Sequence, residues 1–448
     1  MTHQSVAKII SWNADLEAVC ASAAKMSTTL GNASEIFEAT RSSGNSTELI
    51  RKVLRSGHKS VIEHAVFSIA FQDVSVFVEQ FLIECRLASF TVKSRRYVDF
   101  GGQGYLTPVD LHGESLDCYR TYMDTLFDGY RTLLELGVPK EDARFLLPYA
   151  FCSNFYCTLN ARELGNLLSA IRHGRGKGIP ELQELAHQLE EQLSDIFPAL
   201  LSELSGETDE TAPAEELVWF APGDAIHPIS MEEVGQVRLL QQPTQPMEML
   251  RLAHAAAHPH GTPELDLEQL ITSDRPRELE HLTYSFAVLN LTLSGLTHLV
   301  RHRMQSISIP SLCRVDHTRC IVPDTVQKNP AALECYTRTL AQVSEHLAQV
   351  RGDASLRKYG YYFALSGNVV DVMTTMNARE LMLLLRLRTC NRAQWEIRKV
   401  AEEMLALLRE SFPELFKLYG PTCVLTGVCP EGRLTCGKKE EIQKKYRG

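Results

Sequence analysis

Two hydrophobic patterns recur along the chain and predict the same kind of domain twice. Residues Val61–Phe71 are rich in β-branched and aromatic side chains, which favours a strand, and Leu279–Leu289 is its counterpart. Helix-like segments follow at Val76–Leu87 and Leu293–Met304. Residues Asn377–Arg409 are full of Leu, Met, Arg, Glu and Ala and lack Gly and Pro, which predicts a long helical segment. We therefore expect an α+β fold, in which a small antiparallel sheet is flanked by long helices.

An internal repeat relates these elements. The five-residue run Asn160–Leu164 returns as Asn377–Leu381, 217 residues later. Further identical pairs at this separation are Glu63 and Glu280, His64 and His281, Ser68 and Ser285, Ala70 and Ala287, Arg86 and Arg303, Ser89 and Ser306, and Ser94 and Ser311. One constant separation over this whole stretch indicates a tandem duplication.

The repeat predicts two domains joined by a linker. We place the first domain at residues 1–205, the linker at 206–216 and the second domain at 217–448. The run from Ser205 to Glu216, SGETDETAPAEE, is acidic, small and polar, as exposed linkers are. A period this long indicates whole domains, and we expect the two to pair about a pseudo-two-fold axis.

Composition and charge exclude several classes of protein. Hydrophobic residues make up 44% of the 448 residues, so a core can form without disulfides. The net charge of −9 argues against a broad basic surface for a nucleic-acid polymer, although a local Arg cluster can still bind a small anion. No stretch is long and apolar enough for a membrane span, and the N-terminus lacks the apolar core of a signal peptide. We expect a cytoplasmic protein with reduced thiols.

A basic tripeptide is the first candidate site. Arg301, His302 and Arg303 are followed, after seven residues, by Ser311. Contiguous cationic side chains suit an anion such as a phosphate or a reduced flavin ring, because Arg supplies fixed donors and a permanent charge. A solvated basic helix end is the alternative, since cations also favour a helix C-terminus.

A second motif lies in the helical segment, which reads NARELMLLLRLRTCNRAQWEIRKVAEEM. Asn377 and Arg388 are 11 residues apart, about three helical turns, so both are expected on one helix face, towards a ligand pocket or on an amphipathic surface. The R-H-R motif, the Ser that follows it after seven residues and this second motif together make the chain resemble the flavin-dependent thymidylate synthases. The chain resembles two fused copies of such a subunit, of which the second is better preserved. The resemblance implies flavin contacts for Arg301, His302, Arg303, Asn377 and Arg379.

The first copy resembles the family through other motifs. His58, Ser60 and Glu63 in GHKSVIEH match a segment whose family role implies flavin contacts. Ser94 and Arg96 in SRRY, and Arg144 in ARFLLP, are implied to bind the nucleotide phosphate. In this copy Glu84-Cys85-Arg86 stands in place of R-H-R, and A-Q-W-E-I-R is not found. The second copy has lost the other motifs: Arg275 and Arg277 replace the His/Ser pair, and Tyr361 replaces Arg144. Its Arg314 lies one residue after the position of the S-x-R-Y arginine.

This complementary loss predicts a composite pocket. Family members are tetramers with sites assembled between subunits, so a homodimer of this chain would mimic the tetramer. The pocket would take His58, Ser94, Arg96 and Arg144 from the first repeat, and Arg301–Arg303 and Arg388 from the second.

The resemblance implies an enzyme that converts dUMP to dTMP by reductive methylation, with FAD as cofactor and NADPH and methylenetetrahydrofolate as co-substrates. Arg388 would clamp the substrate, and Arg388, Ser311 and Ser94 are the candidate catalytic residues. No base near either serine is visible to activate it as a nucleophile.

Two departures from the family favour an alternative. A Gln expected three residues before R-H-R is replaced by Phe81 and His298, and an acidic residue two before the motif Ser by Val92 and Ile309. Losing donors matched to a substrate weakens discrimination strongly. A catalytically altered or silent flavin- or nucleotide-binding paralogue is therefore the second hypothesis.

Cysteine and histidine clusters remain. Cys423, Cys429 and Cys436, with Cys390 as a candidate fourth ligand, have the chemistry for Zn²⁺ or an iron–sulfur cluster, but their spacing favours a Cys-bearing tail with Gly/Pro turns. His254, His258 and His260 have no acidic or Cys partner near in sequence, so we interpret them as surface residues. We assign no metal ligand.

Overall fold

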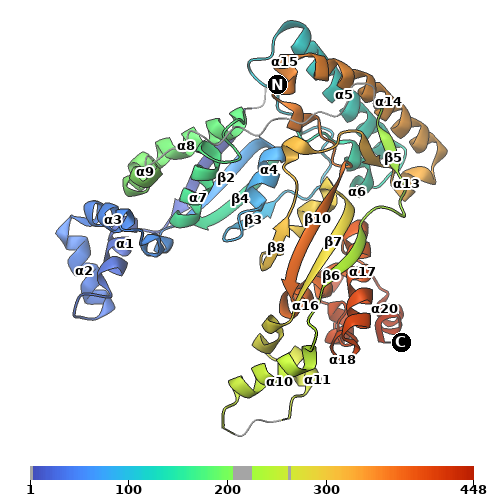
Figure 1. The fold of residues 1–448 in the computed structure, drawn as a ribbon. Helices are drawn as coiled ribbons and strands as arrows, with labels where there is room; N and C mark the ends of the chain where they lie inside the picture. The colour runs from blue at the N-terminus through green and yellow to red at the C-terminus, as the bar shows by residue number, and fades with distance from the viewer. Residues whose placement is uncertain (1–3, 205–224, 261–263, 448) are drawn as a thin grey trace. The chain divides into compact units, whose positions relative to one another are not determined.

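The computed structural model describes residues 4–204, 225–260 and 264–447 (Figure 1). These residues form two compact units. Unit 1 contains residues 4–131, 147–204 and 345–363, and unit 2 contains residues 132–146, 225–260, 264–344 and 364–447. The predicted linker, residues 206–216, lies outside the described residues.

Unit 1 is built on a four-stranded antiparallel sheet with the strand order β1-β2-β4-β3. The strands are β1 (Val6–Trp12), β2 (Val66–Ser75), β3 (Ser89–Val92) and β4 (Cys152–Asn160). Its helices include α1 (Leu16–Lys25), α2 (Ala33–Ser43), α3 (Ser46–Arg55), η1 (Lys59–His64), α4 (Val76–Ile83), most of α5 (Gly113–Glu135), α7 (Ala161–Arg172), α8 (Pro180–Ile196) and α9 (Pro198–Leu204). Gln188 and Gln192 on α8 hydrogen-bond to the β1 backbone, which protects this sheet edge.

Unit 2 repeats this topology with the strand order β6-β7-β10-β8. Its strands are β6 (Gln236–Gln241), β7 (Thr283–Thr292), β8 (Gln305–Ser308) and β10 (Val369–Asn377). Its main helices are α10 (Pro246–Ala257), α11 (Leu267–Thr272), η3 (Arg277–His281), α12 (Leu293–Leu299), most of α14 (Pro330–Gly352), α16 (Ala378–Arg388), α17 (Trp395–Ser411) and α20 (Lys439–Arg447). A short parallel pair, β5 (His227–Ile229) and β9 (Arg319–Ile321), completes the strands among the described residues. Two sheets of one topology confirm the predicted tandem α+β fold.

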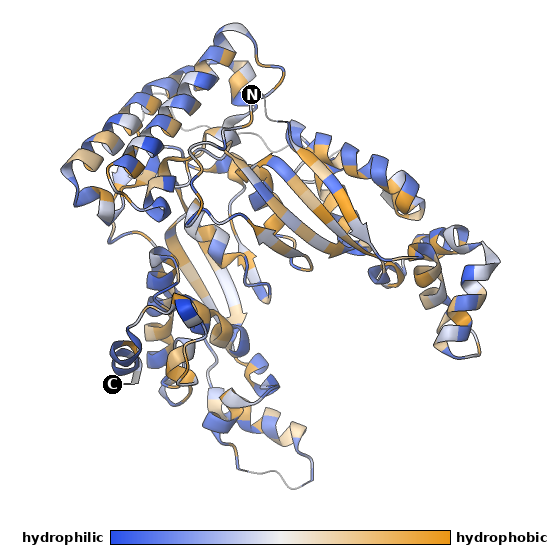
Figure 2. Ribbon diagram, turned by 180° about the vertical axis from the view of Figure 1, so that it is seen from behind, coloured by the Kyte–Doolittle hydropathy of each residue, from blue (hydrophilic) through white to orange (hydrophobic). Residues whose placement is uncertain are grey.

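Alternating burial along the strands explains the sheets. In β4 and β10 most alternate residues are buried, and Figure 2 shows hydrophobic and polar bands along the strands. Both central strands also contain a bulge at one equivalent position. Asp73 in β2 and Asn290 in β7 have φ of 49° and 53°, a conformation that Asp and Asn tolerate. The duplication therefore preserves a local irregularity as well as the strand order.

Each unit includes one segment from the other repeat. Residues 132–146, with α6 (Lys140–Ala143) and η2 (Arg144–Leu146), belong to unit 2, where Asp142 accepts hydrogen bonds from Trp395 (2.8 Å) and Thr325 (2.7 Å). Residues 345–363, with α15 (Ala354–Arg357) and η5 (Gly360–Phe363), belong to unit 1, where the carbonyl of Phe363 accepts a bond from Tyr122 (2.9 Å). Arg144 therefore lies in the unit that contains the R-H-R motif.

Several predicted element boundaries are wrong. The strand predicted at Val61–Phe71 begins only at Val66, because Lys59–His64 forms the 3-10 turn η1; η3 does the same before β7. The helices after these strands end early, at Ile83 and Leu299. The segment Asn377–Arg409 is broken between α16 and α17, where the Gln394 side chain caps α17 by accepting from the Ile397 backbone N–H.

A buried glutamate holds the helix start after the central strand in both units. In unit 2 Glu396 accepts from the backbone N–H (2.7 Å) and the hydroxyl (2.5 Å) of Thr292, which caps α12. In unit 1 Glu181 accepts the same two bonds from Ser75, which caps α4. Helix α8 begins 215 rather than 217 residues before α17. An alignment at the constant separation of 217 residues therefore does not pair Glu181 with Glu396. The statement that A-Q-W-E-I-R is lost from the first copy is therefore wrong for its glutamate.

No helix within the described ranges combines the length and apolar character needed to cross a membrane.

Candidate functional site

The R-H-R motif lies in the turn between α12 and β8. Arg301 and Arg303 are exposed, whereas His302 between them is buried. This alternation places Arg301 and Arg303 at the surface of unit 2 and the imidazole of His302 in its interior.

His302 lies between Glu380 and Arg388. Its Nδ1 is 3.0 Å from Oε1 of Glu380, and its Nε2 accepts from Nε of Arg388 at 3.0 Å. Burial lowers the pKa of His302, and the nearby Arg388 charge lowers it further, against the opposing effect of Glu380. The ring is therefore neutral, with its proton on Nδ1, because a nitrogen that accepts from a guanidinium cannot be protonated.

This contact fixes Arg388, the last residue of α16. Its Nε donates to His302 and its Nη2 donates to the carbonyl oxygen of His298 at 3.3 Å. The predicted flavin ligand His302 is thus surrounded by protein groups, and we interpret it as a residue that orients Arg388.

Asn377 and Arg379 have partners that explain their presence without a ligand. Asn377 caps α16 by accepting from the Glu380 backbone N–H, and Arg379 pairs with Glu280. In unit 1 Asn160 caps α7 in the same way, and Arg162 pairs with Glu63 at 2.5 Å. Because these contacts occur in both copies, they account for the retention of the N-A-R-E-L run.

The other predicted flavin residues of the first repeat lie at the surface. His58 and Ser60 are exposed at η1 and its start, and Glu63 in the same turn is occupied by Arg162. Their flavin contacts stay a prediction.

The two arginines of the S-R-R-Y motif lie in different environments. Arg95 is buried and pairs with Glu79, which also accepts from Ser153. Arg96 is half-buried after β3, and the Ser94 hydroxyl accepts from its backbone N–H at 3.4 Å. Ser311 makes the equivalent bond with the Cys313 N–H at 3.2 Å, so the turn is retained where the arginine is not.

Arg144 is buried in unit 2, with its Nε donating to the Glu141 carbonyl at 3.0 Å. It also lies near enough to Glu396 to favour the charged form of that carboxyl, although burial raises the pKa of Glu396 to about 7. Tyr361, at the equivalent position of the second repeat, is buried in unit 1, with its ring 4.3 Å from that of Phe77. The exchanged segments therefore place the cationic Arg144 in unit 2 and the aromatic Tyr361 in unit 1.

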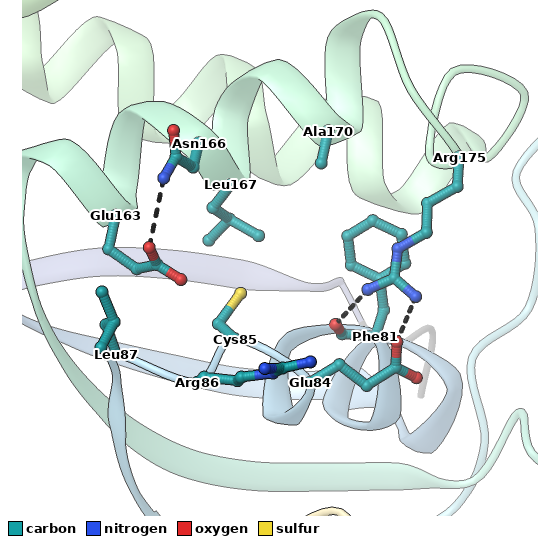
Figure 3. Close-up of a pocket in the computed structure, with 10 residues that line it drawn as sticks. All are labelled: Phe81, Glu84, Cys85, Arg86, Leu87, Glu163, Asn166, Leu167, Ala170 and Arg175. Carbon is teal, nitrogen blue, oxygen red and sulfur yellow. Dashed lines mark hydrogen bonds and ion pairs between the residues drawn. The ribbon is translucent and has the colours of Figure 1, made fainter. Parts of the chain in front are cut away.

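The decayed motif of the first repeat borders a cavity of about 360 Å³ (Figure 3). Cys85 replaces the histidine, Ile171 stands at the position of Arg388, and Glu163 bonds to Asn166 at 3.2 Å instead of to an imidazole. Burial raises the pKa of Cys85 to about 12, so the thiol stays protonated. This cavity therefore lacks the neutral histidine of unit 2, and its Arg175 pairs with Glu84 and donates to the Phe81 carbonyl at 3.1 Å.

The tail cysteines lie near enough to Cys390 to affect one another electrostatically, but among the described residues their sulfurs do not form a metal-ligand group. Burial raises the pKa of the Cys423 thiol, and nearby Cys390, Cys429 and Cys436 raise it further. The Arg392 backbone N–H also donates to the Cys390 sulfur. The interpretation of these residues as a Cys-bearing tail with Gly/Pro turns stays a prediction, which metal analysis of cysteine variants checks.

Sequence reasoning missed Glu380, the carboxylate that anchors His302. Its signal was present in the repeated N-A-R-E-L run, where Glu163 and Glu380 are the equivalent residues. Neither residue has a motif of its own, so only the fold shows which one has a histidine partner.

Comparisons with known proteins agree with the repeat. The family model of the thymidylate synthase complementing protein matches residues 8–199 and again 240–414. A flavin-dependent thymidylate synthase of Clostridium tetani is 33% identical over 198 residues, covering 40% of this chain and 79% of that protein. One from Geobacter sulfurreducens is 32% identical over 185 residues, with coverage of 40% and 79%.

Among solved structures, the UMP/dUMP methylase PolB from Streptomyces cacaoi bound with 5-Br dUMP aligns with a TM-score of 0.38 at 22% identity. The alignment covers 46% of this chain and 97% of that chain, and a likeness this weak carries no argument. The two matches of the family model span most of the sequence, one in each repeat. The chain therefore belongs to the thymidylate synthase complementing protein family, as a member in which two family domains are joined in tandem.

Proposed function

We propose that the protein is a flavin-dependent thymidylate synthase that converts dUMP to dTMP by reductive methylation. Family membership over both repeats supports this, as do relatives that bear this name at 32–33% identity. The observation that carries the proposal is the assembly of Glu380, His302 and Arg388 beside two exposed arginines.

The donor set in unit 2 fits an anionic flavin cofactor. Arg301 and Arg303 expose permanent charges whose planar donors match phosphate oxygens, and buried His302 holds Arg388 at the same turn. Bound FAD, reduced by NADPH, would supply the hydride, and methylenetetrahydrofolate the carbon. The protein residues would bind, orient and neutralise charge, and neutral His302 keeps the Arg388 guanidinium in one position.

The nucleotide contacts extend the proposal to the first repeat. Ser94 and Arg96 form a turn in unit 1 that would bind the phosphate of dUMP, and Arg144 supplies a further cation in unit 2. A composite pocket that joins these residues to Arg301–Arg303, in a homodimer that mimics a tetramer, remains part of the proposal. Ser311 stays a candidate near the nucleotide.

A catalytically silent flavin- or nucleotide-binding paralogue is the second candidate. Its support is the first repeat, where Cys85 replaces the histidine beside the cavity of about 360 Å³ and Ile171 stands at the sequence position of Arg388. It predicts that flavin or nucleotide binds without turnover.

Complementation of a thymidine auxotroph by the full chain tests the proposal. The active enzyme should restore growth without thymidine, and the purified protein should show a flavin spectrum that NADPH bleaches. A folded, flavin-bound protein that fails to complement and releases no tritium from labelled dUMP would instead support the silent paralogue.

A further inference from the structure

Two histidines and a glutamate that are distant in sequence meet in unit 2. His254 lies on α10, His258 follows that helix directly, and Glu278 lies on η3. One potential ligand atom from each residue lies within 4.8 Å of the others, and the two imidazole centroids are 4.3 Å apart. The sequence offers His254 and His258 no acidic partner nearby, but the fold supplies Glu278, and His254 is half-buried rather than fully exposed.

The contact between His254 and Glu278 has the spacing of two ligands on one ion. Nδ1 of His254 is 3.3 Å from Oε1 of Glu278. This is long for a hydrogen bond from imidazole to a carboxylate, which is typically about 2.7–2.9 Å when charge-assisted. It matches the edge of a tetrahedron whose centre lies about 2.0 Å from nitrogen and oxygen ligands, an edge of about 3.3 Å.

Hydrogen bonding also leaves His254 incompletely satisfied. Its side chain is only 13% exposed, and its Nδ1 makes the 3.3 Å contact with Glu278. A metal ion bound at Nδ1 would replace this long contact with a stronger one.

The orientation of His258 favours metal ligation. Its Nδ1 lies 2.9 Å from the carbonyl oxygen of His254, so Nδ1–H donates to the backbone. The lone pair of the neutral ring is then on Nε2. Metal-ligating histidines commonly use this arrangement, in which a backbone carbonyl fixes the tautomer from the non-ligating nitrogen.

We propose that His254, His258 and Glu278 bind one Zn²⁺ or a similar divalent transition metal, with water at the fourth position. The ion would fasten α10 to η3. That turn begins at Arg277 and follows Arg275, the two residues that replace His58 and Ser60 of the first repeat. The bound ion would thus hold the turn in the copy that has lost the pair for which the family resemblance implies flavin contacts.

The test is Zn²⁺ binding by the full chain after removal of metal with a chelator. Wild type is compared with His254→Gln, His258→Gln and Glu278→Gln, and with His260→Gln, an exposed neighbour outside the cluster, as the matched control. Wild type and His260→Gln should bind one Zn²⁺ more than each cluster variant, measured by elemental analysis and competition with a chromogenic chelator. Equal Zn²⁺ stoichiometry and affinity in all five proteins would overturn the proposal.

Co²⁺ as a second probe separates this site from the tail cysteines. Cobalt bound through nitrogen and oxygen shows weak visible bands, whereas thiolate ligands add a strong near-ultraviolet charge-transfer band. The cluster variants should lose the weak bands selectively and should no longer gain the rise in melting temperature of about 2–4 °C expected on metal addition. Co²⁺ spectra and thermal shifts that are unchanged in properly folded cluster variants would contradict the site.

Discussion

In unit 1 buried Glu79 accepts bonds from Arg95 and Ser153, whereas the equivalent positions of unit 2 are Leu296, Leu312 and Val370. All six side chains are buried. A buried ion pair must recover the cost of desolvating two charges, so an apolar trio of similar volume can stabilise a fold equally well. The two units therefore reach one architecture through different core chemistry.

The functional turn shows the opposite division. Unit 2 keeps Glu380, His302 and Arg388 in contact, whereas unit 1 keeps only the glutamate, Glu163. Scaffold contacts such as the helix caps of Asn160 and Asn377 are the same in both. Both copies therefore retain the scaffold contacts, but only the second retains the contact between histidine and arginine. Equivalent substitutions in the two copies can thus be compared directly.

The largest expected effect concerns the buried ion pair. Glu79→Leu should lower the free energy of unfolding of unit 1 by about 3–5 kcal/mol, because Arg95 stays buried without its counter-charge. The triple change Glu79→Leu, Arg95→Leu and Ser153→Val, which copies unit 2, should stay within about 1 kcal/mol of wild type or exceed it. Denaturant unfolding followed by hydrogen-exchange mass spectrometry reports each unit separately. A triple variant as unstable as the single one would break the comparison.

A pH dependence comes next. Burial raises the pKa of Glu396 from 4.5 to about 7, so between these values the folded state holds a proton that the unfolded chain has released. The free energy of unfolding of unit 2 should therefore fall as pH rises from 4.5 to 7, by about 3 kcal/mol in total. Glu396→Gln should flatten this slope, and Glu410→Gln, an exposed change on the same helix, should not. Melting temperatures between pH 4.5 and 8 check this; parallel curves for wild type and Glu396→Gln would refute it.

The third prediction sharpens the difference between the functional turns. His302→Gln should lower kcat about 100-fold, because Arg388 loses the partner that positions its guanidinium. Cys85→Ala, the equivalent position in unit 1, should leave kcat unchanged. Steady-state kinetics that separate kcat from KM make the measurement, and similar kcat values for the two variants would remove the positioning role of His302.

The smallest effect concerns a contact shared by both copies. Arg162→Ala and Arg379→Ala each remove a half-exposed ion pair, with Glu63 and Glu280 respectively. Each should cost no more than about 1 kcal/mol in chemical denaturation, because solvent screens such pairs. A clearly larger loss for Arg379→Ala alone would point to a role beyond the scaffold.

The repeat and the fold class could be predicted because identical residues kept one separation through the strands. The match of Glu181 with Glu396 could not, since the second repeat is two residues shorter before α17 than the first is before α8, which shifts the register. The break between α16 and α17 has no Gly or Pro to mark it and depends on the Gln394 cap. The predicted ends of helices and strands were wrong where a side-chain cap or a 3-10 turn, rather than a Gly or Pro, marked the boundary.

The candidate site was predicted in composition but not in arrangement. R-H-R and Arg388 were identifiable from motifs, whereas the burial of His302 between Glu380 and Arg388 depends on packing between segments 78 or more residues apart. Segment exchange, which places Arg144 in unit 2, is likewise a property of tertiary contacts. The pairing of His254 with Glu278 was missed for the same reason.

The central claim is that the second repeat carries the flavin-dependent chemistry, and one paired measurement tests it. Arg303 and Arg86 are equivalent exposed arginines, one in the intact motif and one in the decayed motif. Tritium release from labelled dUMP, with NADPH and methylenetetrahydrofolate present, should fall at least about 100-fold in Arg303→Ala and stay within about twofold of wild type in Arg86→Ala. Equal losses in both variants, or a greater loss in Arg86→Ala, would contradict the account.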